Sequence, residues 1–138
     1  MLNRYYFDTS IWLDLIEDRD EPNLPKGLWA QKLFGKIILD DSKILYSDMT
    51  ISELKVVGYS QHELNNIFKK LNPVLVFVNC TNKQVKKAKN ISSRRGVPKG
   101  DVLHALVARN NSSVLVTLDK HFKKLADITR YSKPQDLI

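Results

Sequence analysis

Four carboxylates in the sequence occupy positions from which they could bind a metal ion together. Asp8 follows the apolar run "RYYF", Glu53 lies shortly after "KILYS", Asp101 opens an apolar segment, and Asp119 lies just past "SVLVT". Like charges within about 4–6 Å of one another raise pKa values and cost stability, which a divalent cation offsets. Because carboxylate oxygens would be the main ligands, we expect Mg²⁺ or Mn²⁺ rather than zinc.

Each of these acids also has an explanation that involves no metal. Asp8 could merely precede a helix N-terminus, and Asp101 could complement a helix dipole. Glu53 fits the capping box Thr50-x-x-Glu53, and Asp119 is a natural N-cap for "KHFKKL". Capping accounts for one acid at a time, but it does not require four of them to meet at one edge of a fold. The metal cluster is the simpler common explanation.

An alternation of strands and helices predicts where the acids lie. Hydrophobic periodicity indicates strands at residues 4–7, 43–47, 73–78, 113–117 and 128–131. Helices are expected between them, at residues 10–17, 28–39, 50–56, 64–71, 81–95, 101–109 and 120–125. Such alternation favours a parallel sheet that is covered on both faces. We therefore expect an α/β fold, a three-layer α/β/α sandwich around a central, mostly parallel sheet of four or five strands.

The predicted fold gives the acids a shared location. In open parallel sheets, ligands gather beyond the C-terminal ends of the strands. Asp8, Glu53 and Asp119 each come after such an end, and Asp101 begins the helix that leads into the fourth strand. All four are expected at one edge of the sheet.

The size of the chain fits one domain, which we expect to span residues 1–138. No apolar run approaches the roughly 18 residues that cross a bilayer. The N-terminus lacks the continuous apolar stretch of a signal peptide. These features predict a cytoplasmic protein with no membrane association. Cys80 is the only cysteine, so no internal disulfide can form.

Positive charge is concentrated in the middle of the chain. The total is +7, yet residues 64–100 contain 9 Lys and Arg and no acid. A segment of this kind would attract nucleic acid through counterion release, and it could equally be a solvated helix face. The basic side chains expected to contact nucleic acid lie in the helix expected at residues 81–95: Lys83, Lys86, Lys87, Arg94 and Arg95.

The histidines do not suggest a zinc site. His104 follows Asp101 by three residues, so the two side chains lie on one face of the expected helix. It could orient a carboxylate or contact substrate, or it could be purely structural. His62 is expected on a surface helix, and His121 has lysine neighbours. Asp48 could be a fifth acid of the site, but "SDMT" is also typical of a capping turn.

Four segments, "FDTSIWLDL", "SDMTISEL", "KGDVLHALVA" and "LVTLDKHF", together resemble the PIN-domain family of metal-dependent nucleases. Within that family the chain is most similar to the single-domain VapC-like ribonuclease toxins. The resemblance covers essentially the whole chain. It implies an acidic quartet with two small polar neighbours: Asp8, Glu53, Asp101 and Asp119, with Ser10 and Thr117.

The resemblance also implies an activity and partners. The reaction would be Mg²⁺- or Mn²⁺-dependent hydrolysis of RNA phosphodiester bonds. Asp8, Asp101 and Asp119 would hold the metal, while Glu53 would be a further ligand or the group that takes a proton. The implied partners are the RNA substrate, a cognate antitoxin and a second copy of the chain in a homodimer.

Two features depart from the family pattern. Many relatives carry a further acid just after the position of Asp119, where this chain has Lys120 and His121. One metal is therefore expected to bind tightly, and a second only with substrate. The loop at residues 17–27 is long for the family, which puts in doubt the transfer of a partner-binding groove.

Two other functions remain open from the sequence. The first is a catalytically inactive PIN-like module that binds RNA or protein, against which the intact quartet argues. The second is aspartyl-phosphate chemistry, as in a phosphatase or a receiver domain. The phosphatase pattern D-x-D-x-T is absent because Ser10 occupies the second Asp position. A receiver would need its phosphoacceptor after the third strand, where the chain has "VNCTNK".

Overall fold

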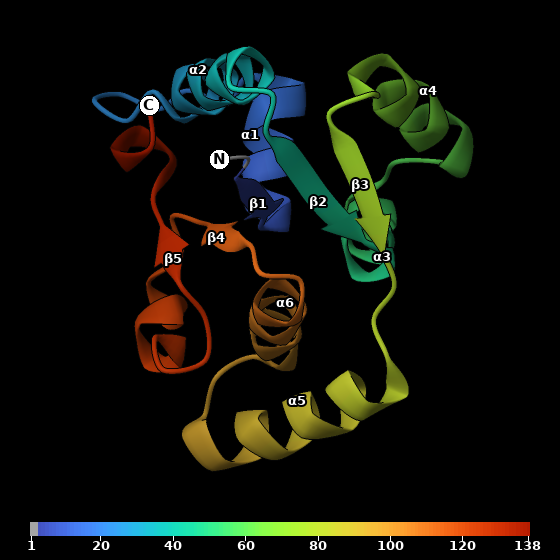
Figure 1. The fold of residues 1–138 in the computed structure, drawn as a ribbon, viewed down its shortest axis with the longest axis vertical. Coiled ribbons are helices and arrows are strands. Elements are labelled where there is room, and N and C mark those ends of the chain that lie inside the picture. Colours follow the sequence, from blue (N-terminus) through green and yellow to red (C-terminus); the bar gives the residue numbers. More distant parts are fainter. Residues whose placement is uncertain (1–2) are drawn as a thin grey trace.

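A five-stranded parallel sheet forms the centre of the fold (Figure 1). The structure is a computed structural model, and it describes residues 3–138. The strands lie in the order β3-β2-β1-β4-β5, and every neighbouring pair is parallel. Their bounds are Arg4–Phe7 (β1), Lys43–Ser47 (β2), Leu75–Val78 (β3), Val114–Val116 (β4) and Tyr131–Ser132 (β5). The expected parallel α/β fold is confirmed.

Helices cover both faces of this sheet, so the fold has three layers (Figure 1). The α-helices are α1 (Thr9–Glu17), α2 (Lys26–Leu39), α3 (Asp48–Val57), α4 (Gln61–Leu71), α5 (Asn82–Arg95) and α6 (Lys99–Asn110). Two short 3₁₀ helices follow, η1 (Lys120–Leu125) and η2 (Pro134–Asp136). Within residues 3–138, none of the helices has the length and apolar character needed to cross a bilayer.

The central strands are apolar in their middle residues, and each contributes to two separate cores. In β1, Tyr5 and Phe7 pack with α1, α2 and α4 on one face, while Tyr6 packs with α6 and η1 on the other. Ile44 and Leu45 divide in the same way in β2. Strands buried on both faces are expected to read as continuous apolar runs, as these do.

The start of α3 corrects one expectation and bears on the site. The helix begins at Asp48, not at Thr50, because Ser47 caps it. The Ser47 side chain accepts from the Thr50 amide at 3.3 Å, and the Thr50 hydroxyl accepts from the Ser47 amide at 3.2 Å. The capping box Thr50-x-x-Glu53 is therefore wrong. Glu53 lies in the second turn of α3, with its carboxylate available for other contacts.

The first helix also begins earlier than expected, at Thr9. Asp8 occupies the N-cap position, although its side chain makes no capping hydrogen bond. Ser10, the first residue of the helix expected at residues 10–17, lies inside α1 and donates a hydrogen bond to Asp8 Oδ2 at 2.9 Å. Both polar side chains at the start of α1 are thus turned to each other rather than to the helix backbone.

Candidate functional site

The four acids lie where the C-terminal ends of β1, β2 and β4 meet the start of α6. Asp8 directly follows β1, Glu53 lies in α3 just beyond β2, and Asp119 lies beyond β4. Asp101 is in the first turn of α6. We refer to Asp8, Glu53, Asp101 and Asp119 as the acidic edge.

Asp8 is the most buried member of the acidic edge, with an exposed fraction of 7%. Its Oδ2 accepts hydrogen bonds from Ser10 at 2.9 Å and from Thr117 at 3.0 Å. Burial raises the pKa of Asp8, although the positive charge of His104 and these two hydrogen bonds oppose that shift. The carboxylate is therefore rigidly held, at a cost that a nearby cation would reduce.

Thr117 connects Asp8 to Asp119. Its hydroxyl donates to Asp8, and its oxygen accepts from the Asp119 amide at 3.0 Å. The Asp119 side chain in turn caps η1 by accepting from the His121 amide at 2.9 Å. This cap was expected from the sequence, and the structure shows that it leaves Asp119 close to other members of the acidic edge.

A buried chain of hydrogen bonds fixes Glu53. Its Oε1 accepts from the Thr9 hydroxyl at 2.7 Å and contacts Nε2 of His104, which is 1% exposed. The Nδ1 atom of His104 lies 2.6 Å from the Tyr6 hydroxyl, which lies 2.7 Å from Ser47 Oγ. The structure therefore places His104 against a carboxylate, as one of the three possibilities considered for it requires.

Within these hydrogen bonds, the pKa shifts of Glu53 and His104 are those of an ion pair. Burial raises the pKa of Glu53, but the hydrogen bond and charge of His104 outweigh it, so the pKa of Glu53 is lowered. Burial lowers the pKa of His104, but the hydrogen bond and charge of Glu53 outweigh it, and the pKa of His104 is raised. Both shifts favour the charged forms, an imidazolium beside a carboxylate.

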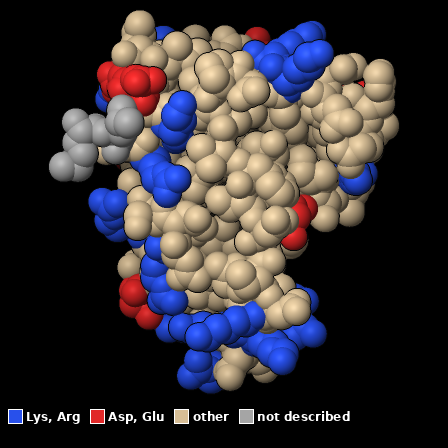
Figure 2. Space-filling view, turned by 45° about the vertical axis from the view of Figure 1, so that its right-hand side comes forward, with Lys and Arg blue, Asp and Glu red and all other residues tan. Residues whose placement is uncertain are grey.

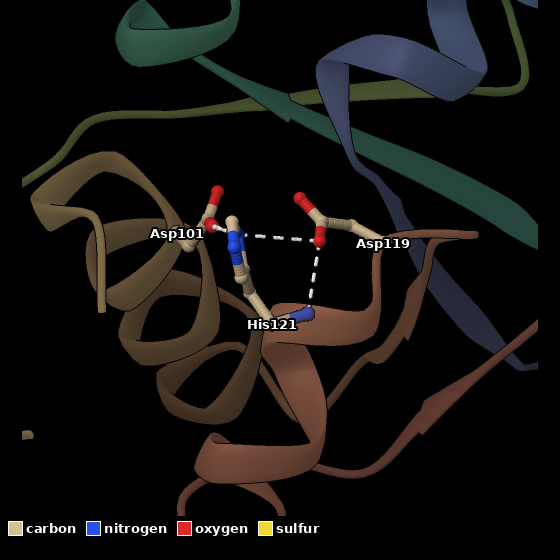
Figure 3. A group of neighbouring side chains, drawn as sticks. All are labelled: Asp101, Asp119 and His121. Carbon is tan, nitrogen blue, oxygen red and sulfur yellow. Dashed lines mark hydrogen bonds and ion pairs between the residues drawn. The ribbon is translucent and has the colours of Figure 1, made fainter. Parts of the chain in front are cut away.

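Asp101 and Asp119 converge on His121, as Figure 3 shows. His121 Nδ1 lies 3.0 Å from Asp101 Oδ2 and 3.3 Å from Asp119 Oδ1. One potential ligand atom from each residue lies within 4.8 Å of those of the other two. Burial and the charges of Asp119 and Asp8 raise the pKa of Asp101, which the hydrogen bond from His121 only partly offsets.

These residues fit a divalent cation. Asp101, whose pKa is raised by burial and by the charges of Asp119 and Asp8, and the neighbouring Asp119 carboxylate form a donor set of the kind that hard cations prefer. The structure joins Asp8 to Asp119 through Thr117, and the charges of Asp8 and Asp119 both act on Asp101. All three acids expected as ligands therefore belong to one electrostatic cluster.

His121 is the one residue of this cluster that sequence reasoning set aside. Its lysine neighbours suggested a surface position, and its side chain is indeed 53% exposed. A usable signal was present, because an N-cap such as Asp119 accepts from the amide two or three residues later. That hydrogen bond brings the side chain of residue 121 back to the cap.

Two acids near the acidic edge in the sequence, Asp48 and Asp14, do not belong to it. Asp48 accepts a hydrogen bond from the Cys80 amide at 2.8 Å, and Asp14 pairs with Arg19 at 2.9 Å. Each therefore has a structural partner.

The basic residues of α5 other than Arg95 are exposed at the lower end of the molecule, where Lys and Arg gather in Figure 2. Arg95 differs from the others because its guanidinium binds both oxygens of Asp127, at 2.7 and 2.9 Å. The exposed cations expected to contact RNA are Lys83, Lys86, Lys87 and Arg94. Helix α5 packs along α6, the helix that carries Asp101.

Comparisons with known proteins agree with this fold. A family model described as PIN domain matches residues 5–128. A toxin-antitoxin complex from Klebsiella pneumoniae is similar at 19% identity, with a TM-score of 0.62 over 94% of this chain and 97% of that chain. VapBC-1 from nontypeable Haemophilus influenzae is 18% identical, with a TM-score of 0.66 over 95% and 98% of the two chains.

A third solved structure, VapBC2 from Rickettsia felis bound to a DNA fragment from its promoter, is 18% identical. Its TM-score is 0.63, and the match covers 94% of this chain and 98% of that chain. No curated protein matches the chain. At these identities the solved structures show a shared fold.

Proposed function

Because the chain belongs to the PIN-domain family, we propose that it is a Mg²⁺- or Mn²⁺-dependent endoribonuclease that hydrolyses RNA phosphodiester bonds. The observation that carries this proposal is the gathering of Asp8, Glu53, Asp101 and Asp119 at one edge of the sheet. Thr117 joins Asp8 to Asp119, and His121 joins Asp119 to Asp101. The active unit would be the whole chain, residues 1–138.

Asp8, Asp101 and Asp119 would hold the cation. A bound divalent ion lowers the pKa of water and stabilises the charge that develops on a phosphodiester. Ser10 and Thr117 would keep Asp8 in place through their hydrogen bonds to Oδ2. Rigid support of this kind matters because a misplaced ligand costs both affinity and rate.

Glu53 would be a further ligand or the group that takes a proton from the attacking water. Its lowered pKa keeps the carboxylate ionised, the form that either role requires. Thr9 and His104 both bind Oε1 and so fix the orientation of the carboxylate. His104 would act through Glu53, as a positioning residue.

Helix α5 would hold the RNA strand. Lys83, Lys86, Lys87 and Arg94 are exposed and would contact phosphates, which positions the strand without reading its sequence. Arg95 was expected in the same role, but its pairing with Asp127 suggests a smaller contribution. The preference for RNA over DNA rests on the family.

The similarity to toxin-antitoxin complexes supports a proposal about partners. The chain would be the toxin of a toxin-antitoxin pair, bound and held inactive by a cognate antitoxin. It would act on RNA in the cytoplasm, as a monomer or a homodimer.

The experiment is an incubation of the purified protein with mixed RNAs and Mg²⁺ or Mn²⁺, with and without EDTA. We expect cleavage with the metal and none with EDTA. Asp8→Asn should remove cleavage, whereas Asp40→Asn, at the exposed end of α2, should not. Cleavage that persists in EDTA or in Asp8→Asn would contradict the proposal. RNA binding without cleavage by the wild type would favour the inactive module.

A further inference from the structure

His121 places an imidazole nitrogen beside the carboxylate oxygens of the acidic edge. We propose that its Nδ1 is a metal ligand beside Asp101 and Asp119, and that it shifts the preference of the site from Mg²⁺ toward first-row transition ions such as Mn²⁺ and Co²⁺. This inference rests on the proposed metal site at the acidic edge, and it specifies which ion that site selects.

The distances among His121, Asp101 and Asp119 suit ligands of one ion. Two ligands at about 2.1 Å from an ion, and at right angles around it, are about 3.0 Å apart. His121 Nδ1 lies 3.0 Å from Asp101 Oδ2 and 3.3 Å from Asp119 Oδ1. The nitrogen therefore already has the separation from both carboxylates that neighbouring ligands of one ion have (Figure 3).

The local fold keeps this arrangement in place. The His121 amide donates to Asp119 Oδ1 at 2.9 Å, so the backbone that carries the imidazole is tied to one of its two partners. The next residue, Phe122, is fully buried with Leu125 in the core beneath α6. Both η1, which carries His121, and α6, which carries Asp101, are thus anchored in the same core.

The environment of His121 does not suggest a packing role. Its side chain is 53% exposed, in contrast to His104, which is 1% exposed inside the hydrogen-bond chain. The contacts that the imidazole makes are to the two carboxylates. An exposed imidazole whose only described side-chain partners are two candidate ligands is placed to share their ion.

Ligand chemistry then sets the direction of the preference. Mg²⁺ binds almost exclusively to oxygen, whereas imidazole is a good ligand for the later first-row divalent ions. Replacing an oxygen donor with neutral imidazole therefore weakens the binding of Mg²⁺ more than the binding of Co²⁺. Mn²⁺ should lie between the two, in keeping with its place in the affinity series.

The test is calorimetric titration of the whole protein with Mg²⁺, Mn²⁺ and Co²⁺, without substrate. We expect His121→Asn to weaken Co²⁺ binding by about tenfold or more and Mg²⁺ binding by less than about threefold. His121→Asp should lower the ratio of Co²⁺ to Mg²⁺ affinity further by restoring an oxygen donor. His62→Asn, at an exposed site on α4, is the matched control and should leave all three affinities unchanged.

A second measurement locates the bound ion near His121. Substoichiometric Mn²⁺ should broaden the imidazole proton signals of His121 before those of His62. An unchanged Co²⁺-to-Mg²⁺ ratio in His121→Asn would overturn the inference. If Asp119→Asn abolished metal binding in that same series, the proposed metal site would still stand. Absence of binding of any ion to the wild type would overturn both.

Discussion

At the scale of a single residue, Asp101 shows how the acidic edge lowers the stability of the fold when no metal is bound. Its pKa is raised by burial and by the charge of Asp119. For an acid, a raised folded-state pKa means that the ionised form is disfavoured in the fold. This cost is present above the folded pKa and disappears as the pH falls through it. At neutral pH, Asp101 therefore opposes folding unless a cation is bound.

Neutralising Asp101 should separate stability from metal binding. Without metal, Asp101→Asn should be more stable than the wild type by roughly 0.5–1 kcal/mol at pH 7, because the repulsion is removed. With Mn²⁺ the wild type should gain thermal stability by mass action, and the variant should not. Thermal melts with and without Mn²⁺ make the comparison. An equal gain in both proteins would show that the ion binds elsewhere.

The pair of His104 and Glu53 predicts a pH dependence with a defined window. The raised pKa of His104 contributes stability that is complete below its ordinary value of 6.5 and lost as the pH rises through the folded pKa. The lowered pKa of Glu53 contributes stability that is complete above its ordinary value of 4.5 and lost as the pH falls through the folded pKa. The pair should therefore stabilise most between pH 4.5 and 6.5.

Urea unfolding of His104→Gln tests this window. The variant should lose about 1 kcal/mol or more relative to the wild type near the upper end of the window, because a half-buried carboxylate, partly screened by solvent, is left without its charged partner. The difference should shrink toward pH 9, where the imidazole of the wild type approaches neutrality. A loss that stays constant from pH 6 to pH 9 would mean that the two side chains do not form an ion pair.

At the scale of elements, α2 is positioned by the close approach of its first turn to the end of α1. Gly27 lies in α2 beside Asp18, which follows α1 in a left-handed conformation with φ 51°. A Cβ added at Gly27 would come within 2.7 Å of the Asp18 carbonyl carbon. Gly35, in the same helix, has no neighbouring atom within 4 Å of such a Cβ.

The two glycines should therefore respond in opposite ways to alanine. Gly27→Ala should destabilise the protein by about 1–3 kcal/mol through overpacking. Gly35→Ala should be neutral or stabilising by up to about 1 kcal/mol, because alanine has a higher helix propensity than glycine. Denaturant midpoints of the two variants measure the contrast. Equal midpoints would show that α1 and α2 pack less closely than described.

A separate prediction concerns the contribution of α5 to RNA binding. In an Asp8→Asn background, which prevents cleavage, Lys83, Lys86 and Lys87 are changed together to Gln. Binding should weaken, and the slope of log affinity against log salt should become shallower by about 2. A control with the same net charge changes three exposed lysines on other parts of the surface: Lys32, Lys70 and Lys133. An equal loss of RNA affinity in the control would show that α5 contributes only through the overall positive charge of the protein.

The elements were largely predictable because their signals are local. Apolar runs located four of the strands, whereas the fifth, expected at residues 128–131, lies at Tyr131–Ser132. The helix expected at residues 81–95 is α5, which Thr81 caps. The sequence offered two starts for α3, and the capping box Thr50-x-x-Glu53 is wrong, whereas the capping turn "SDMT" is confirmed, with Ser47 as the N-cap. Only the fold could show which pairing wins, since both fit the capping pattern.

The site was predictable in part for the same reason. The four acids stand at strand ends and helix starts, which a parallel topology brings together. The contacts of Glu53 with Thr9 and His104 cross from one element to another, as does the approach of His121 to Asp101. Contacts of this kind depend on packing between distant segments, and no local pattern encodes them.

At the scale of the whole molecule, opposite charges are separated in a way that suits a polyanionic substrate. Acids gather where three strands end, while exposed cations gather on α5, next to the helix that carries Asp101. The cations would hold an RNA strand, and the acids with their ion would act on one phosphodiester. The PIN-domain fold thus joins two surfaces that a nuclease needs.

The most direct test of this account is the rate of RNA cleavage as the Mn²⁺ concentration is raised from zero, in the wild type and in Asp119→Asn. The rate of the wild type should rise from nothing to a plateau, because cleavage requires an ion held by the acidic edge. Asp119→Asn should show no cleavage at concentrations that saturate the wild type. A rate that does not depend on Mn²⁺, or a variant that follows the curve of the wild type, would contradict the account.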